Sequence, residues 1–213
     1  MKIGLLADSS GDIDALDRGT QLLLDKGAER LFFLGGRFPD VDALFTRRRQ
    51  KRRGHEGYSD QDFVDDVAAF LGSQARPGTR GTQLDEVERL RRSFSRVPCK
   101  ESLEYRDPNV PKKLVEMVGE TLACLVHDKA DLIKDDMLNA VLLMHGKSPE
   151  PNVVQIGPRY FVTPGRLTGA SEQTCALLEL TAAELRFLAF TLDGQTVKTQ
   201  SFARGTTNKV SVK

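Results

Sequence analysis

The chain has 213 residues, of which 39% are hydrophobic and 29% are charged, and its formal net charge is +1. This composition excludes a disordered or fibrous protein, and it gives no bulk electrostatic attraction toward nucleic acid or a membrane surface. No apolar run reaches the ~20 residues of a membrane span, and the N-terminus lacks the layout of a secretory signal. The cysteines are scattered without a CxxC spacing, as is typical of free thiols in a reducing compartment. We therefore expect a cytoplasmic protein with one domain and a sizeable core.

The stretch Ile3–Gly11, I-G-L-L-A-D-S-S-G, predicts a buried strand that ends in a tight polar turn. Functional sites in α/β folds gather at the carboxyl ends of strands. Asp8, which follows this strand directly, is therefore the first candidate functional residue.

A helix is predicted next, because Asp12 or Asp14 can cap its start and Gly27 can end it. A second short buried strand over 31–34 follows and leads into Gly35-Gly36. A strand, a helix and a second strand in close succession predict a βαβ unit with a parallel pair.

The most concentrated charge in the chain follows a short helix predicted over 39–45. It consists of Arg47, Arg48, Arg49, Lys51, Arg52 and Arg53. One interpretation is a solvated loop, because like charges repel one another. The other is a patch that binds nucleic acid, an anionic surface or an acidic partner. No aromatic residue interrupts the run, so base stacking is not indicated.

Two more helices are predicted beyond this basic run. A capping box at Ser59–Asp62 opens the first, a loop over 74–81 follows, and Thr82 caps the second, with Arg89, Arg91 and Arg92 on its outer face.

The second half of the chain predicts mostly strands. A helix is expected over 109–118, with Leu114, Val115 and Val118 inward, and residues 203–213 are expected to form a flexible tail. Asp193-Gly194 is a strong hairpin turn between the last two strands. The predicted strands cover 121–126, 140–144, 153–157, 160–162, 175–180, 184–192 and 195–202.

The turn Asp8-Ser9-Ser10-Gly11 resembles the Asp-x-His-Gly motif that opens calcineurin-like metallophosphoesterases of the small bacterial phosphodiesterase type. Later landmarks occur in the family's order, ending with Thr163-Pro164-Gly165-Arg166, which resembles Asn-Pro-Gly-Ser. The resemblance implies an α/β fold, an αββα sandwich of two mixed β-sheets flanked by helices, in a single domain over 1–213. It also implies that 46–95 is a helical, basic insertion, because compact family members cross this interval in fewer residues.

The resemblance further implies a two-metal site, for which this sequence lacks most ligands. Asp8 and His127 match the family, whereas Ser10, Gly36, Pro98, Lys147 and Pro149 stand at the other ligand positions. Gly36 replaces the aspartate that bridges the two metals, and glycine has no side chain that could do so. Two ligands fall below the three that catalytic metal sites usually keep. We therefore assign no catalytic residue, no metal and no cofactor.

The main hypothesis is a catalytically degenerate pseudoenzyme that acts as a protein-binding scaffold or regulatory module. The alternative is a metal-dependent phosphodiesterase or phosphatase with an altered site, which would use Asp8 and His127 with two divalent metals such as manganese.

A further alternative is metal-free binding of phosphate or a nucleotide by Ser9, Ser10, Gly11 and Lys147, at a helix N-terminus. An uncompensated buried carboxylate is costly. We therefore also predict that Lys147 pairs with Asp8 and replaces the charge of the metals.

Overall fold

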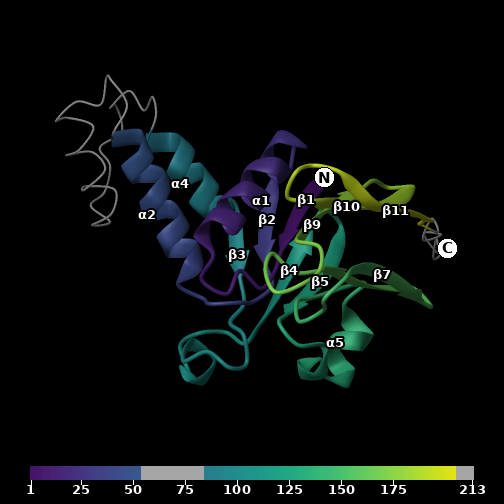
Figure 1. The fold of residues 1–213 in the computed structure, drawn as a ribbon. Coiled ribbons are helices and arrows are strands. Elements are labelled where there is room, and N and C mark those ends of the chain that lie inside the picture. Colours follow the sequence, from purple (N-terminus) through teal and green to yellow (C-terminus); the bar gives the residue numbers. More distant parts are fainter. Residues whose placement is uncertain (54–83, 205–213) are drawn as a thin grey trace, which may run out of the picture.

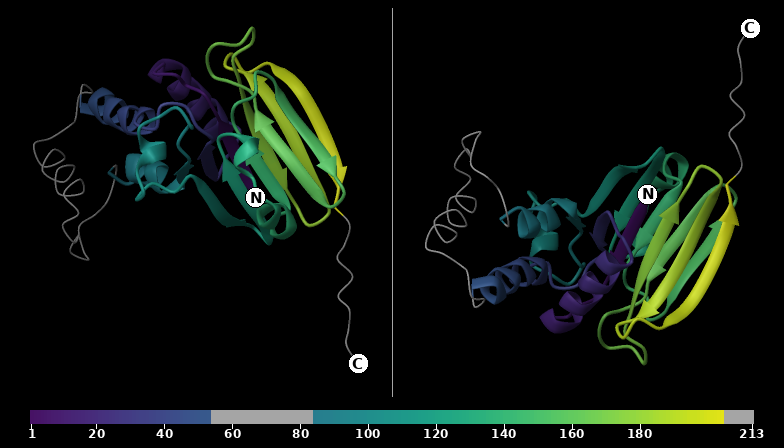
Figure 2. Two further views of the ribbon diagram at one scale, coloured as in Figure 1. Left: turned by 90° about the horizontal axis from the view of Figure 1, so that it is seen from below. Right: turned by 90° about the horizontal axis from the view of Figure 1, so that it is seen from above.

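Two β-sheets lie face to face and helices cover their outer faces (Figure 1). The computed structural model describes residues 1–53 and 84–204. The two further views show the sheets as separate layers, with α1, α2 and α4 on one side (Figure 2). The predicted α/β sandwich of two mixed sheets is confirmed.

The first sheet has the order β11-β10-β9-β1-β2-β3. Strands β1, β2 and β3 are parallel to one another, with Leu5 opposite Phe32 and Phe32 opposite Ser95. Strands β9, β10 and β11 are each antiparallel to their neighbours. The strands are β1 (Lys2–Leu6), β2 (Arg30–Phe33), β3 (Phe94–Arg96), β9 (Thr174–Leu180), β10 (Glu184–Thr191) and β11 (Thr196–Ala203).

The second sheet has the order β4-β5-β6-β8-β7, and its three central strands are parallel. Its outer strands β4 and β7 are antiparallel to their neighbours. The strands are β4 (Lys113–Val118), β5 (Thr121–Val126), β6 (Leu142–His145), β7 (Pro151–Ile156) and β8 (Arg159–Pro164).

The helices are α1 (Ile13–Asp25), α2 (Asp40–Arg53), α4 (Leu84–Ser93) and α5 (Lys134–Asn139), with 3-10 turns η1 (Glu104–Arg106) and η2 (Lys129–Asp131). The Asp12 side chain accepts a hydrogen bond from the amide of Ala15, so Asp12 is the N-cap of α1, and Asp14, the other predicted cap, lies in the first turn of the helix. None of the described helices is long and apolar enough to cross a membrane.

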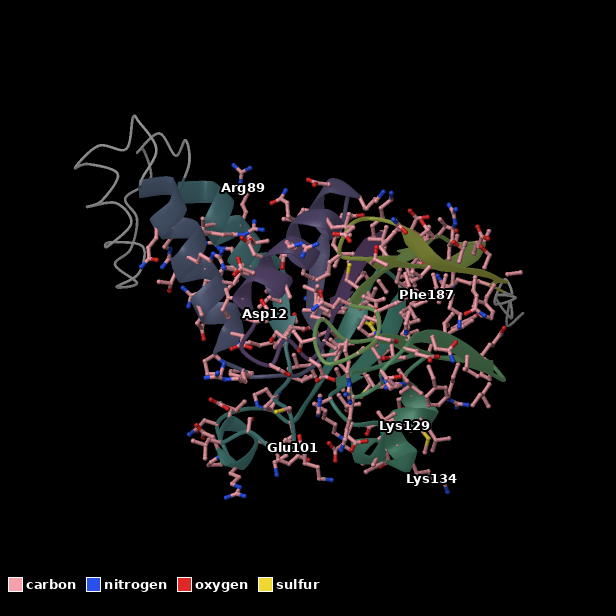
Figure 3. The ribbon with its side chains drawn as sticks, viewed as in Figure 1. Asp12, Arg89, Glu101, Lys129, Lys134 and Phe187 are labelled. Carbon is pink, nitrogen blue, oxygen red and sulfur yellow. The ribbon has the colours of Figure 1, made fainter. Side chains whose placement is uncertain are left out.

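The main core fills the space between the sheets. Phe187 of β10 points into it (Figure 3), and its buried neighbours include Ile3, Leu5, Phe32, Leu125 and Val162. A second core lies between the first sheet and helices α1, α2 and α4. Burial on both faces explains why β1 and β2 have almost no polar side chains.

The predicted helix over 109–118 is wrong, because residues 113–118 form strand β4. Val118 pairs with Thr121 across a tight turn that contains Gly119, whose φ is +58°. Leu114 and Val118 lie toward the core, whereas Val115 and Met117 are 54% and 56% exposed. Apolar residues on both faces of β4 hide the alternation that predicts a strand.

The basic run is helical and does not form a loop, because it is the second half of α2 (Figure 1). Arg47 pairs with Asp14, and Arg48 Nε lies 2.7 Å from Asp17 Oδ1. Both carboxylates belong to α1. These carboxylates compensate part of the charge that was expected to prevent a regular helix. The side chains of Lys51, Arg52 and Arg53 are not described.

Several predictions fall outside the described residues: the capping box at Ser59–Asp62, the loop over 74–81, the Thr82 cap and the tail beyond 204. Within the proposed insertion, the sequence missed β3, which pairs in parallel with β2 and ends the crossover that contains α2 and α4.

Candidate functional site

A cleft of about 400 Å³ opens where the parallel strands of both sheets end. These strands are β1, β2 and the short edge strand β3 in the first sheet, and β5, β6 and β8 in the second. Each of them is followed by at least one residue that lines the cleft. The lining consists of Asp8, Ser10, Gly36, Arg37, Cys99, Glu101, His127, Lys147, Arg166, Thr168 and Gly169.

The carboxylate of Asp8 lies at the inner end of the cleft, and both of its oxygens have partners. Oδ1 is 3.1 Å from His127 Nε2, and Oδ2 is 3.1 Å from Arg166 Nε. The side chains of Asp8 and His127 are only 14% and 5% exposed. Thr168 Oγ1 donates a hydrogen bond to the backbone carbonyl of Asp8 and ties the β8–β9 connection to the same turn.

The predicted pair between Lys147 and Asp8 is wrong. Lys147 Nζ lies 2.7 Å from Asp128 and 3.7 Å from Glu101, and Arg166 is the cation beside Asp8. The hydrogen bond from Lys147, together with one from the amide of Ala130, lowers the pKa of Asp128 to about 2. The same hydrogen bond to Asp128 raises the pKa of Lys147. Lys147 therefore holds together the outer part of the cleft, where Glu101 belongs to the β3–β4 connection (Figure 3).

The turn after β1 is anchored by a residue that the sequence did not single out. Asp40, the first residue of α2, is 3% exposed. Its Oδ2 accepts hydrogen bonds from Ser9 Oγ at 2.6 Å and from the amide of Gly11 at 2.8 Å. These donors are thus occupied by Asp40, which leaves only Ser10 of the predicted anion-binding turn lining the cleft.

Backbone strain is concentrated around the cleft. Among the described residues other than glycine, only Asp8, Ser10 and Lys147 have a positive φ, of 53°, 49° and 42°, and all three line the cleft. Left-handed conformations cost a residue with a Cβ roughly 1–2 kcal/mol, and they persist where surrounding contacts impose them. At Asp8 and Ser10, the Asp40 carboxylate and the contacts of Asp8 supply that constraint.

Glycines allow the close approach of the inner residues. A Cβ on Gly35, whose φ is +101°, would lie 2.1 Å from His127 Cδ2. A Cβ on Gly36, whose φ is +124°, would lie 3.0 Å from the backbone nitrogen of Ser9. The position at which the resemblance implies a metal-bridging aspartate therefore has a backbone and a packing that suit glycine.

The donor set does not fit a two-metal centre. In the part of the chain that the structure describes, no group of three or more His, Cys, Asp and Glu side chains is placed to hold a metal ion. Both oxygens of Asp8 are engaged by the Arg166 guanidinium and the His127 ring. Of the other predicted ligand positions, Ser10, Gly36 and Lys147 line the cleft, whereas Pro98 and Pro149 do not.

Arg37 is the second cation that the sequence did not predict. Its side chain is 69% exposed, and its Nε is 3.9 Å from Asp40 Oδ1. A Cβ on Gly11 would lie 2.8 Å from Arg37 Nη1, so the guanidinium covers the turn beside Ser10. Both cations could have been found from their positions in the sequence, because Arg37 directly follows Gly35-Gly36 and Arg166 directly follows Thr163-Pro164-Gly165.

The three cysteines are free thiols. Cys99 is partly buried and lines the cleft. Burial raises the pKa of Cys124 to about 11 and that of Cys175 to about 12, so both remain protonated at neutral pH.

No protein-family model matches the sequence, and neither does any curated protein. Solved structures do match the fold. A conserved uncharacterized protein from Streptococcus pneumoniae TIGR4, a predicted phosphoesterase, has 16% identity and a TM-score of 0.59, over 95% of this chain and 97% of that one. The E. coli phosphoesterase Yfce has 17% identity and a TM-score of 0.55, over 96% and 100%. Chaetomium thermophilum Vps29 has 12% identity and a TM-score of 0.56, over 96% and 99%.

These similarities extend over nearly the whole chain, although the identities are too low to show more than the fold. The two mixed β-sheets flanked by helices agree with these similarities. The chain therefore has the fold of the calcineurin-like metallophosphoesterases.

Proposed function

We propose that this protein is a pseudoenzyme, a metallophosphoesterase fold that works without a metal cofactor as a protein-binding scaffold. The observation that carries the proposal is the contact of Asp8 with both Arg166 and His127. The alternative hydrolase would need these same two groups, Asp8 and His127, as free metal ligands.

The ion pair opposes metal binding for an electrostatic reason. A divalent cation at Asp8 would have to displace the Arg166 guanidinium or lie against it, and like charges at such a distance repel strongly in a partly buried site. The displaced guanidinium would also lose its partner. The residues at the remaining ligand positions offer little compensation, because Gly36 has no side chain and the ammonium of Lys147 is itself cationic.

A band of exposed apolar side chains supports the scaffold role. It lies on β4 and around α5, and its members are between 38% and 60% exposed: Val115, Met117, Ile133, Met137 and Leu138. Exposed apolar patches commonly mark interaction sites. A Vps29 with the same fold, at a TM-score of 0.53, is known in complex with a cyclic peptide. We propose that the partner is a protein segment that presents apolar side chains to this band.

The absence of a metal requirement is tested by loading the protein with manganese, desalting it and measuring metal by mass spectrometry. The E. coli phosphoesterase Yfce, treated in parallel, serves as the control for retention. We expect no stoichiometric metal and no manganese-dependent cleavage of bis(p-nitrophenyl) phosphate. Bound metal at one or two ions per chain, together with such cleavage, would favour the hydrolase.

The scaffold role is tested with a matched pair of surface variants. Met117→Asp places a charge in the apolar band, whereas Val197→Asp changes an apolar residue on β11 that is 37% exposed. We expect a partner that binds the unaltered protein and Val197→Asp equally, but not Met117→Asp, in titrations with purified components. If no partner distinguishes the two variants, the band is not the binding surface.

Binding of nucleic acid through the basic run, and the cytoplasmic location, stay predictions. The pairing of Arg47 and Arg48 with α1 reduces the charge that the run presents.

A further inference from the structure

We infer that residues 99–112 form a strap over one side of the cleft, held there by ion pairs, and that the cleft opens when these pairs are screened or removed. The strap is the outer part of the connection between β3 and β4. The inference goes beyond the proposed function and does not depend on it, because it concerns access to the cleft rather than what the protein binds.

The strap supplies two side chains to the lining of the cleft. Cys99, at the start of the strap, and Glu101 both line it. Figure 3 shows Glu101 on a loop that extends away from the two sheets. A movement of this loop away from the sheets would therefore widen the cleft and expose Cys99.

Little packing fixes the strap in its position. None of its residues is buried, and Leu103 is 81% exposed, whereas Val97 and Pro98 directly before it are buried. The backbone hydrogen bonds described for the strap have both partners within it, as in the bond from the Ser102 amide to the Cys99 carbonyl. Segments with few buried apolar contacts open locally at a low cost in free energy.

Two ion pairs hold the strap against the second sheet's side of the cleft. Lys100 Nζ lies 3.5 Å from Asp131 Oδ1, and Glu101 Oε1 lies 3.7 Å from Lys147 Nζ. Asp131 belongs to η2 after β5, and Lys147 follows β6. The strap's own partners are exposed, at 49% for Lys100 and 67% for Glu101. Exposed ion pairs are weak and are screened by salt, so the attachment is reversible.

Tyr105 brings a further group of the strap close to the same carboxylate. Burial and the negative charge of Asp131 raise the pKa of Tyr105. Within the strap, Lys112 Nζ lies 4.8 Å from the centroid of the Tyr105 ring. Asp131 is therefore the main point at which the strap is attached.

Cys99 provides a direct reporter of the opening. Cys124 and Cys175 are fully buried, and burial raises their pKa to about 11 and about 12. Reaction of a thiol requires access and the thiolate form. An uncharged reagent such as iodoacetamide should therefore modify Cys99 well before the other two cysteines.

The test is the rate at which iodoacetamide modifies Cys99 in the full chain at fixed pH, followed by mass spectrometry, with Cys99→Ser as the blank. We expect the rate to rise roughly two- to fivefold between about 20 mM and about 500 mM sodium chloride, because salt screens the ion pairs. This series needs no altered contact, so it does not depend on the folding of a variant.

Lys100→Met should raise the rate at low salt by a similar factor. Loss of a cation beside a thiol disfavours the thiolate and by itself slows the reaction, so a faster reaction reports opening. Lys112→Met is the matched control, because it removes the same charge from the strap but Lys112 makes none of the described ion pairs. Its rate should equal that of the unaltered protein. Circular dichroism would verify that both variants are folded.

Three results would overturn the inference. They are a rate that does not change with salt, equal rates for Lys100→Met and Lys112→Met, and a rate at low salt equal to that of N-acetylcysteine, which would mean that the strap covers nothing. None of them bears on the proposed function, which is judged by metal retention and by the Met117→Asp titration.

Discussion

The inner and outer walls of the cleft both carry charged side chains, but they hold them by different means. The inner wall consists of Asp8 and His127, which line the cleft, with Gly35 and Asp40 packed behind them. The side chains of Asp8, Asp40 and His127 are at most 14% exposed. The outer wall consists of Glu101 and Lys147, which line the cleft, with Asp128 paired to Lys147. The side chains of Glu101, Asp128 and Lys147 are 67%, 16% and 40% exposed. Buried groups depend on exact packing and on hydrogen-bond partners, whereas exposed ion pairs are weakened by water and salt. Damage to the inner wall should therefore cost far more stability.

Gly35→Ala should have the largest effect. Its Cβ would lie 2.1 Å from His127 Cδ2 at a φ of +101°, so steric overlap adds to backbone strain. We expect a loss of about 3 kcal/mol in the free energy of unfolding, measured in urea. Gly157→Ala is the control, since Gly157 also has a positive φ but its Cβ would meet nothing within 4 Å. It should lose only about 1 kcal/mol, and equal losses would mean that packing against His127 is unimportant.

Asp40→Ala should rank second. It leaves the buried Ser9 hydroxyl and the Gly11 amide without their acceptor, which should cost about 2 kcal/mol in the same measurement. Asp42→Ala, at a neighbouring exposed carboxylate that pairs with Arg96, should cost less than about 1 kcal/mol. If the two variants lose equal stability, Asp40 does not anchor the turn.

Lys147→Met should change how stability depends on acid. The folded pKa of Asp128 is about 2, below its ordinary value of 3.8, so the unfolded state binds more protons between these values. The stabilisation from the pair is complete above pH 4 and is lost as the pH falls toward 2. The variant should therefore show a shallower fall of the urea midpoint in this window.

The exposed Lys134→Met is the control for this acid profile, because it removes a lysine outside the pair with Asp128. Its profile should match that of the unaltered protein. A Lys147→Met profile that also matches would show that another group sets the pKa of Asp128.

Glu101→Gln should have the smallest effect. Its carboxylate is 67% exposed and lies 3.7 Å from Lys147, so the loss should stay below about 0.5 kcal/mol. A loss as large as that of Asp40→Ala would show that Glu101 fixes the β3–β4 connection and that the outer wall is as firmly built as the inner one.

Much of the fold could be predicted, because its signals are local. The buried runs of β1 and β5, the Asp12 cap and the Asp193-Gly194 turn act within a few residues. The basic half of α2 could not be predicted in this way, since its partners Asp14 and Asp17 lie on another helix. The turn at Gly119, between two apolar stretches, was the local signal that would have identified β4.

The candidate site was predictable only in part. The family resemblance singled out Asp8 and His127, and the structure brings them within 3.1 Å. The family resemblance did not show which cationic side chain lies beside Asp8, because this depends on the direction of the connections after β6 and β8. Lys147 has a closer carboxylate in Asp128, and the turn after β8 brings Arg166 to Asp8.

The position of β4 has a consequence for the protein at high concentration. Among the described strands, β4 is one of the two edge strands of its sheet, and Val115 and Met117 are exposed on it. The unpaired backbone groups of such a strand can template the addition of a strand from another molecule, which begins aggregation. A lysine in place of Val115 would hinder this stacking, since charged side chains at sheet edges repel incoming chains.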